Sequence, residues 1–150
     1  LLLAKLDNTT PSFRRTAIKV LVKLGVEKVG QLLVTKLDDP SALVRRTVIE
    51  ALGQLDIEQA FLPLLAKLDD PKLNVRIAVI STLEKLGDRR AIAPLLKKLD
   101  DPSITVRRAV IEALGPLGDK QAVPLLKAKL DDPSATIRKA VITALEKLGK

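Results

Sequence analysis

Apolar side chains recur along the chain at the spacing of an amphipathic helix. Over residues 104–117 they fall at positions i, i+4, i+7, i+8 and i+11, namely at Val106, Val110, Ala113, Leu114 and Leu117. A shorter stripe with helical spacing precedes this one and consists of Ile92, Leu95, Leu96 and Leu99. The two stripes predict a pair of packed helices.

This helix pair belongs to a unit that repeats every 31 residues. The motif Leu-Asp-Asp-Pro begins at residues 37, 68, 99 and 130, and Leu6-Asp7 lies 31 residues before the first. Five repeats fit this period, and internal repetition of this kind is typical of solenoids. They cover residues 1–25, 26–56, 57–87, 88–118 and 119–149, so we expect a single repeat array over residues 1–150.

Turn residues separate the predicted helices at fixed places in each repeat. An Asp followed by Pro favours a helix start, with Asp as the N-cap, at Asp39, Asp70, Asp101 and Asp132. In the first repeat Thr10 is the expected cap, so that helix should start about two residues late. Gly follows the last apolar residue in four repeats and Asp56 in the other, which predicts a left-handed residue at each helix end.

Composition narrows both the fold and the chemistry. Apolar residues make up 47% and aromatic residues 1% of the 150, which favours a helical core of Leu, Ile, Val and Ala. The absence of Cys, His, Trp, Tyr and Met excludes thiol or imidazole nucleophiles, Cys/His zinc sites and disulfides. The 18 Asp and Glu residues leave a carboxylate metal or acid–base site formally open. We expect no catalytic, cofactor-binding or metal-binding residues.

Charge and hydropathy give expectations about location and partners. The net charge of +8 predicts attraction to polyanions or acidic proteins. No apolar run approaches the roughly 18 residues that span a bilayer, so we expect no membrane association and a cytoplasmic location. Apolar residues at both ends of the array, Leu1-Leu2-Leu3 and the final helix, predict end-to-end self-association through uncapped terminal repeats.

Individual repeats resemble a known family. The segment 61–71, Phe-Leu-Pro-Leu-Leu-Ala-Lys-Leu-Asp-Asp-Pro, followed by Val75-Arg76 and by residues 83–87, resembles a HEAT repeat. The short period and residues 118–126 resemble, more narrowly, the HEAT-like repeats of the phycobilisome-lyase type. The resemblance covers the whole chain. It implies an all-α fold, a right-handed α-solenoid of five two-helix repeats, with the second helices lining the concave side.

The resemblance also implies a structural ladder between neighbouring repeats, built from the Asp of the turn and the Arg of the second helix. The matching residues are Asp7, Asp38, Asp69, Asp100 and Asp131 with Arg14, Arg45, Arg76, Arg107 and Arg138. We interpret the carboxylates as helix caps and Arg partners, in preference to metal ligands or catalytic pairs. A phosphate-binding row is the alternative reading of the Arg column.

On this fold, the side chains opposite the core stripe of each second helix face the concave groove. The predicted partner-binding residues are Arg15, Lys19, Lys23, Arg46, Glu50, Ile77, Lys85, Arg108, Glu112, Lys139 and Lys147. Eight are basic and two are acidic, which places a net +6 of the chain's +8 on this surface. A concave surface of one sign attracts partners of the opposite charge.

These observations predict a non-catalytic binding or scaffold module that presents a basic concave surface to an acidic protein. Nucleic-acid binding through the same groove is an alternative, restricted to the phosphate backbone because the groove has no aromatic residue for base stacking. An engineered repeat scaffold without a natural ligand is a second alternative, although irregularities such as Pro116 and Asp56 count against it. HEAT-like DNA glycosylases and bilin lyases share the resemblance, but they need reactive groove residues that this chain lacks.

Overall fold

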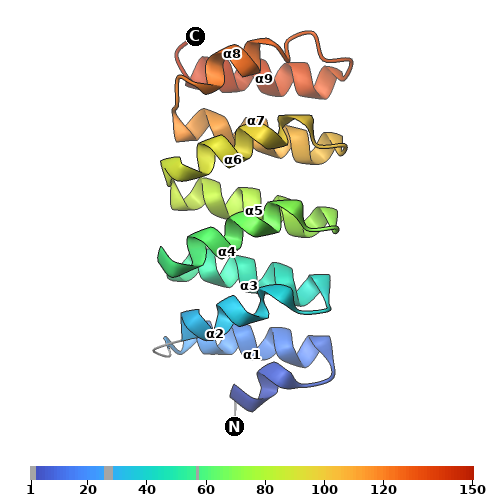
Figure 1. Ribbon diagram of the computed structural model, residues 1–150, viewed down its shortest axis with the longest axis vertical. Coiled ribbons are helices and arrows are strands. Elements are labelled where there is room, and N and C mark those ends of the chain that lie inside the picture. Colours follow the sequence, from blue (N-terminus) through green and yellow to red (C-terminus); the bar gives the residue numbers. More distant parts are fainter. Residues whose placement is uncertain (1–2, 26–28, 57) are drawn as a thin grey trace. The chain divides into compact units, whose positions relative to one another are not determined.

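The computed structural model describes residues 3–25, 29–56 and 58–150. These residues form α-helices joined by short 3-10 helices and turns, and the described part of the chain contains no strand (Figure 1). The chain divides into two compact units, residues 1–82 and 83–150, called here the N-terminal and C-terminal units. The prediction of an all-α fold is confirmed.

In the N-terminal unit, long second helices alternate with shorter helical segments. The second helices are α1 (Pro11–Lys23), α3 (Ala42–Leu55) and α5 (Leu73–Leu86), the last of which continues into the C-terminal unit. The other segments are η1 (Leu3–Asp7), α2 (Val29–Thr35), η2 (Lys36–Asp38), η3 (Glu58–Ala60), α4 (Phe61–Ala66) and η4 (Lys67–Asp69).

The C-terminal unit repeats the pattern with two further second helices, α7 (Ile104–Leu117) and α9 (Ala135–Lys147). The first-helix segments are η5 (Arg89–Ala91), α6 (Ile92–Leu96), η6 (Lys97–Asp100) and α8 (Ala122–Lys127). The first half of a repeat, predicted as one helix, is thus a composite of segments. Pro94 offers no amide to bond four residues back, and the preceding turn closes as a 3-10 helix through the Ile92 amide and the Arg89 carbonyl.

The predicted helix starts are wrong by two residues in three of the repeats. Helices α3, α7 and α9 begin after the N-cap residues Ser41, Ser103 and Ser134, not after the preceding Asp. The Asp39 carboxylate instead accepts a 2.8 Å hydrogen bond from the Ser41 amide, which closes a turn across Pro40. The cap at Thr10 with Pro11 as first residue is confirmed, and it is in register with the other repeats.

The predicted helix ends are confirmed. Gly118 ends α7 with φ of 70°, and Asp56 ends α3 with φ of 46°, both in the left-handed region. The predicted core is also confirmed along each helix pair. Its most enclosed members recur once per repeat, for example at Ile18, Ile49, Ile80 and Ile111, each 0–1% exposed.

Candidate functional site

Two buried arginine–aspartate pairs join consecutive repeats in the N-terminal unit. Arg14 donates to both carboxylate oxygens of Asp39, at 2.7 Å each, and Arg45 does the same to Asp70 at 2.8 and 2.9 Å. Each guanidinium also donates to a backbone carbonyl in its own repeat, that of Asn8 or Asp39. Two-pronged pairs of this kind fix the orientation of both groups.

The ladder therefore exists, but the predicted carboxylates are wrong. The Arg residues pair with the second Asp of the Asp-Asp motif, because the turn across Pro directs this side chain inward, where Asp39 and Asp70 are buried. The predicted members Asp7, Asp38, Asp69, Asp100 and Asp131 are all exposed. Three of them pair with a lysine of the next repeat, in the pairs Asp7–Lys36, Asp38–Lys67 and Asp100–Lys129.

The remaining predicted arginines keep the contact to their own turn. Arg76, Arg107 and Arg138 donate to the backbone carbonyls of Asp70, Asp101 and Asp132, at 2.8, 2.9 and 2.7 Å. Each is half-buried, so these side chains fasten the turn to the helix that follows it. The column is occupied by structural contacts in the described residues, which leaves little of it to act as a phosphate-binding row.

The buried carboxyls titrate abnormally. Burial would raise the pKa of Asp39, but hydrogen bonds from Arg14 and from the Ser41 amide outweigh it and hold the pKa below its ordinary value. The pKa of Asp70 is lowered in the same way, with Arg45 and the Lys72 amide opposing the effect of burial.

This lowered pKa predicts a defined acid sensitivity. A carboxyl with a depressed folded pKa stabilises the fold fully above its unfolded pKa, about 4, and stops doing so as pH falls through the folded value. Asp39→Asn should therefore flatten the decline in the free energy of unfolding below about pH 4, measured by urea unfolding at several pH values. Asp38→Asn is the control and should keep the parental decline. Equal acid limbs for Asp39→Asn and the parent would contradict the prediction.

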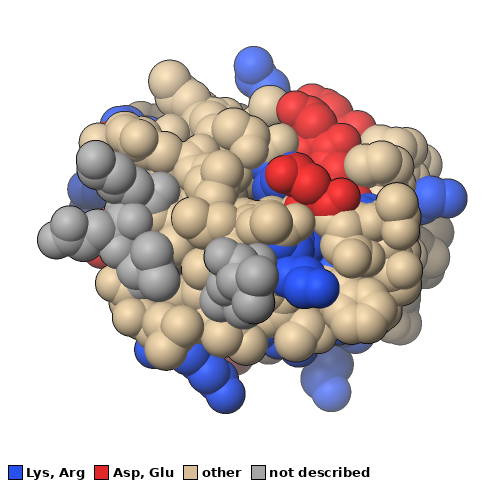
Figure 2. All heavy atoms as spheres, turned by 90° about the horizontal axis from the view of Figure 1, so that it is seen from below, with Lys and Arg blue, Asp and Glu red and all other residues tan. Residues whose placement is uncertain are grey.

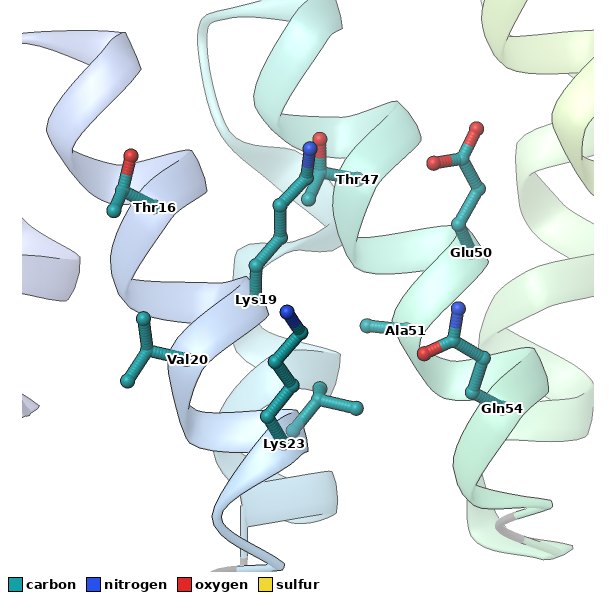
Figure 3. A pocket seen from close by; sticks show the side chains of 9 residues that line it. Thr16, Lys19, Val20, Lys23, Thr47, Glu50, Ala51 and Gln54 are labelled. Atoms are coloured by element: carbon teal, nitrogen blue, oxygen red, sulfur yellow. The ribbon is translucent and has the colours of Figure 1, made fainter.

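The candidate surface of the N-terminal unit lies on the exposed side of α1 and α3. Between these helices is a hollow of about 400 Å³, lined by Thr16, Lys19, Val20, Val22, Lys23, Thr47, Glu50, Ala51 and Gln54. In Figure 3 the side chains of Lys19 and Lys23 extend side by side between the two helices. Arg15 is half-buried and donates a 3.2 Å hydrogen bond to the Thr47 hydroxyl across the same gap.

Charges on this surface differ in how far they are neutralised. Arg46 forms an ion pair with Glu50 one turn along α3, at 2.8 Å, so the acid in the hollow is already partnered. Lys19 and Lys23 are exposed and take part in no ion pair with any residue that the structure describes. The hollow therefore presents two unneutralised ammonium groups.

The predicted residues of the C-terminal unit show the same division. Arg108 lies 3.5 Å from Glu112, one turn along α7. Three lysines, Lys85, Lys139 and Lys147, are exposed and form no ion pair within the described ranges. Ile77 is half-buried on α5 in the N-terminal unit.

Sequence reasoning missed a second hollow, between the beginnings of α3 and α5. It encloses about 380 Å³ and is lined by Ala42, Leu43, Arg46, Lys72, Leu73 and Asn74. Leu43 is 47% and Leu73 38% exposed, so this hollow has an apolar floor at the surface. The signal was available, because the groove-facing positions of the fourth repeat include Ile104 and Thr105, whose counterparts here are Leu73 and Leu43.

Apolar side chains are also exposed at the α1 end of the N-terminal unit. Leu3 is 51%, Phe13 56% and Leu24 66% exposed, and the Lys5 ammonium lies 5.9 Å from the Phe13 ring centroid. Seen from below in Figure 2, uncharged residues cover much of this end and the acidic residues gather at one side. End-to-end self-association stays a prediction.

Searches for other kinds of site give two observations. Within the described ranges, no group of three or more potential ligands is arranged to hold a metal ion. None of the helices in the same ranges is long and apolar enough to cross a membrane.

Comparison with solved structures identifies the fold class. The chain is similar to a chain in the complex of CpcE and CpcF of phycocyanin lyase from Nostoc sp. PCC7120, with 30% identity over 99% of its length and a TM-score of 0.79. It also resembles the Escherichia coli protein YibA, at 23% identity over 99% of its length and a TM-score of 0.72. The match spans 64% and 54% of those two chains.

A designed protein shares the architecture. Computationally designed armadillo repeat proteins for modular peptide recognition match 97% of the chain and 80% of their own length, at 20% identity and a TM-score of 0.66. A search of curated protein sequences gave no match. The predicted α-solenoid class is thus confirmed.

The family model for HEAT repeats matches residues 31–102 and 92–150, which together cover most of the sequence. The matched ranges contain the repeated turns, the arginine column and four of the five second helices. The chain belongs to the HEAT repeat family.

Proposed function

We propose that this chain is a non-catalytic binding module that presents its basic second-helix surface to an acidic protein. The observation that carries the proposal is the hollow between α1 and α3, in which Lys19 and Lys23 have no acidic partner among the described residues. Unneutralised ammonium groups in a hollow raise the local concentration of carboxylates and speed their association.

The contrast with the turns supports this reading. Lys36, Lys67 and Lys129 also reach the surface, and each is neutralised by a carboxylate of the preceding repeat. Those three lysines are accounted for by the fold. Lys19 and Lys23 have no such structural use, which is typical of residues that bind something outside the chain.

A protein partner is favoured over a nucleic acid because neither hollow contains an aromatic side chain. Phe61 is buried at 4% exposure, and Phe13 lies beneath Lys5 at the α1 end. Base stacking on aromatic rings is a principal source of affinity for single-stranded nucleic acids. The similar CpcE–CpcF structure is a complex of two proteins, which is consistent with a protein partner here.

The proposal is tested with an oligoglutamate peptide of about eight residues, an oligolysine peptide and an oligothymidine of matched charge. The parent should bind oligoglutamate saturably at low salt, and the Lys19→Glu/Lys23→Glu variant should bind it about tenfold or more weakly, as measured by fluorescence anisotropy. Stability should change by no more than about 0.5 kcal/mol, because exposed charges contribute little to folding.

Lys97→Glu/Lys127→Glu is the matched control, since it changes the net charge equally at exposed positions on first-helix segments. This variant should retain most of the parental affinity. Equal losses for the two double variants would reduce the effect to overall charge and refute the proposed surface. Tighter binding of oligothymidine than of oligoglutamate, lost with Lys19 and Lys23, would favour the nucleic-acid alternative.

A further inference from the structure

The N-terminal unit has two hollows of different chemistry on its second helices. The hollow between α1 and α3 is basic, with Lys19 and Lys23 beside the amide side chain of Gln54 (Figure 3). The hollow between α3 and α5 is apolar at its floor, where Leu43 and Leu73 are exposed. Both hollows use α3, so their separation is set by one rigid helix.

The basic hollow is suited to a carboxylate side chain. Two ammonium groups and an amide converge on a space of about 400 Å³, and Glu50, the acid in its lining, is held by Arg46. Oxygen acceptors with negative charge satisfy ammonium donors best. An acidic residue of a partner would find both lysines available.

The apolar hollow is suited to an aliphatic side chain with an acidic neighbour. Its floor is formed by Leu43 and Leu73, and its rim carries the basic side chains of Arg46 and Lys72. Lys72 is exposed and pairs with no acid among the residues described. Covering the two leucines would remove apolar surface from water, which favours binding.

The distance between the hollows sets the length of a ligand that fills both. One lies along residues 47–54 of α3 and the other along residues 42–46, an axial offset of roughly 11 Å at 1.5 Å per residue. Adjacent packed helices are about 10 Å apart, so the hollow centres are roughly 15 Å apart. An extended chain covers this distance in about five residues.

We propose that the N-terminal unit binds an extended protein segment that places an acidic side chain against Lys19 and Lys23 and, about five residues away, a bulky aliphatic side chain against Leu43 and Leu73. This inference rests on the proposed function and specifies the ligand of that surface. A nucleic acid has no aliphatic side chain to fill the second hollow, so the two-site arrangement selects a polypeptide.

The test uses labelled peptides of about twelve residues, in a Gly-Ser background, that contain one Glu pair and one Leu at separations of about two, five or eight residues, in both orders. Each is titrated with the whole chain and followed by fluorescence anisotropy. In one of the two orders, the separation of about five should bind about fivefold or more tightly than the others. Replacing its Glu pair with Gln, or its Leu with Ala, should each weaken binding by a similar factor.

Variants of the protein assign each peptide residue to its hollow. Lys19→Gln/Lys23→Gln should weaken the Glu peptide about tenfold and leave the Gln analogue unchanged. Leu43→Ser should weaken the Leu peptide and leave the Ala analogue unchanged. The matched control is Leu62→Ser, which removes a leucine that is 72% exposed on α4, and it should bind as the parent does.

The outcomes separate this inference from the proposed function. If oligoglutamate binds and depends on Lys19 and Lys23, but neither Leu nor its separation affects affinity, the two-site ligand is refuted and the basic surface stands. If no acidic peptide binds at low salt, both are refuted. An oligothymidine that binds more tightly than every peptide would also overturn the inference.

Discussion

Asp70→Asn is expected to lower the free energy of unfolding by about 3–5 kcal/mol. The substitution keeps the size of the side chain and its acceptor for the Lys72 amide, but it removes the charge opposite Arg45. Only 11% of the Arg45 side chain is exposed, so its guanidinium would remain buried with no carboxylate on it. Breaking one side of a buried ion pair costs more than the pair contributed, because the remaining charge is desolvated and uncompensated.

Urea unfolding at neutral pH, followed by circular dichroism, measures this loss. Asp38→Asn provides the control within the neighbouring motif, because Asp38 forms an ion pair with Lys67 but its side chain is 83% exposed. Exposed pairs contribute between zero and about 1 kcal/mol, so this variant should unfold close to the parent. If both variants lost the same stability, the buried carboxylate would have no special part in holding the repeats together.

Gly53→Ala is expected to destabilise the chain by about 1–3 kcal/mol, even though Ala favours a helix over Gly by up to about 1 kcal/mol. A Cβ at residue 53 would lie 2.6 Å from the Cγ2 methyl of Thr82 on α5. Thr82 is 4% exposed and has no space to withdraw, so α3 and α5 would have to separate. The same measurement applies, with denaturation midpoints at constant slope.

Two further variants locate the cause of this loss. Gly115→Ala places a Cβ 3.2 Å from Cδ of Lys147, whose flexible end can move aside, so this variant should be neutral or slightly more stable. Adding Thr82→Ser to Gly53→Ala removes the clashing methyl and should recover most of the stability. Failure of Thr82→Ser to rescue would mean that the loss arises elsewhere than at this contact.

Local backbone chemistry was predictable, because it depends on residues a few positions apart. The left-handed helix ends at Gly118 and Asp56 and the cap at Thr10 follow from the backbone preferences of those residues. The Asp-Pro starts were misplaced because an Asp before Pro can either cap a helix or close a turn onto the amide two residues on. Only the packed structure decides between these.

The ladder shows how repetition can mislead. The Asp7 column is unbroken in all five repeats, whereas the Asp39 column has Asn8 in the first repeat, so the unbroken column was chosen. In the structure Arg14 reaches forward 25 residues to Asp39 in the next repeat. No Arg precedes Asn8 in the sequence, and Asn8 needs only to accept the Thr10 amide, which it does at 2.9 Å.

The candidate surface was predictable in its composition but not in its shape. Helical spacing identified Lys19, Lys23 and Arg46 as groove-facing because the side opposite a core stripe must face outward. The depth of the two hollows depends on how neighbouring helices are set and on short side chains such as Ala51 and Ala42. Those features arise from packing between repeats, which no single helix encodes.

The forward reach of Arg14 and Arg45 also bears on how the length of this chain can change. Each guanidinium is fastened to its own turn and to a carboxylate 25 residues ahead, so the pair measures the chain between them. Removing or duplicating a block of 31 residues brings an equivalent Asp to the same place and leaves no buried Arg unmatched. An insertion or deletion of any other length between Arg and Asp must be absorbed in a loop or leave a buried charge uncompensated. Whole repeats are therefore the unit by which such a chain gains or loses length.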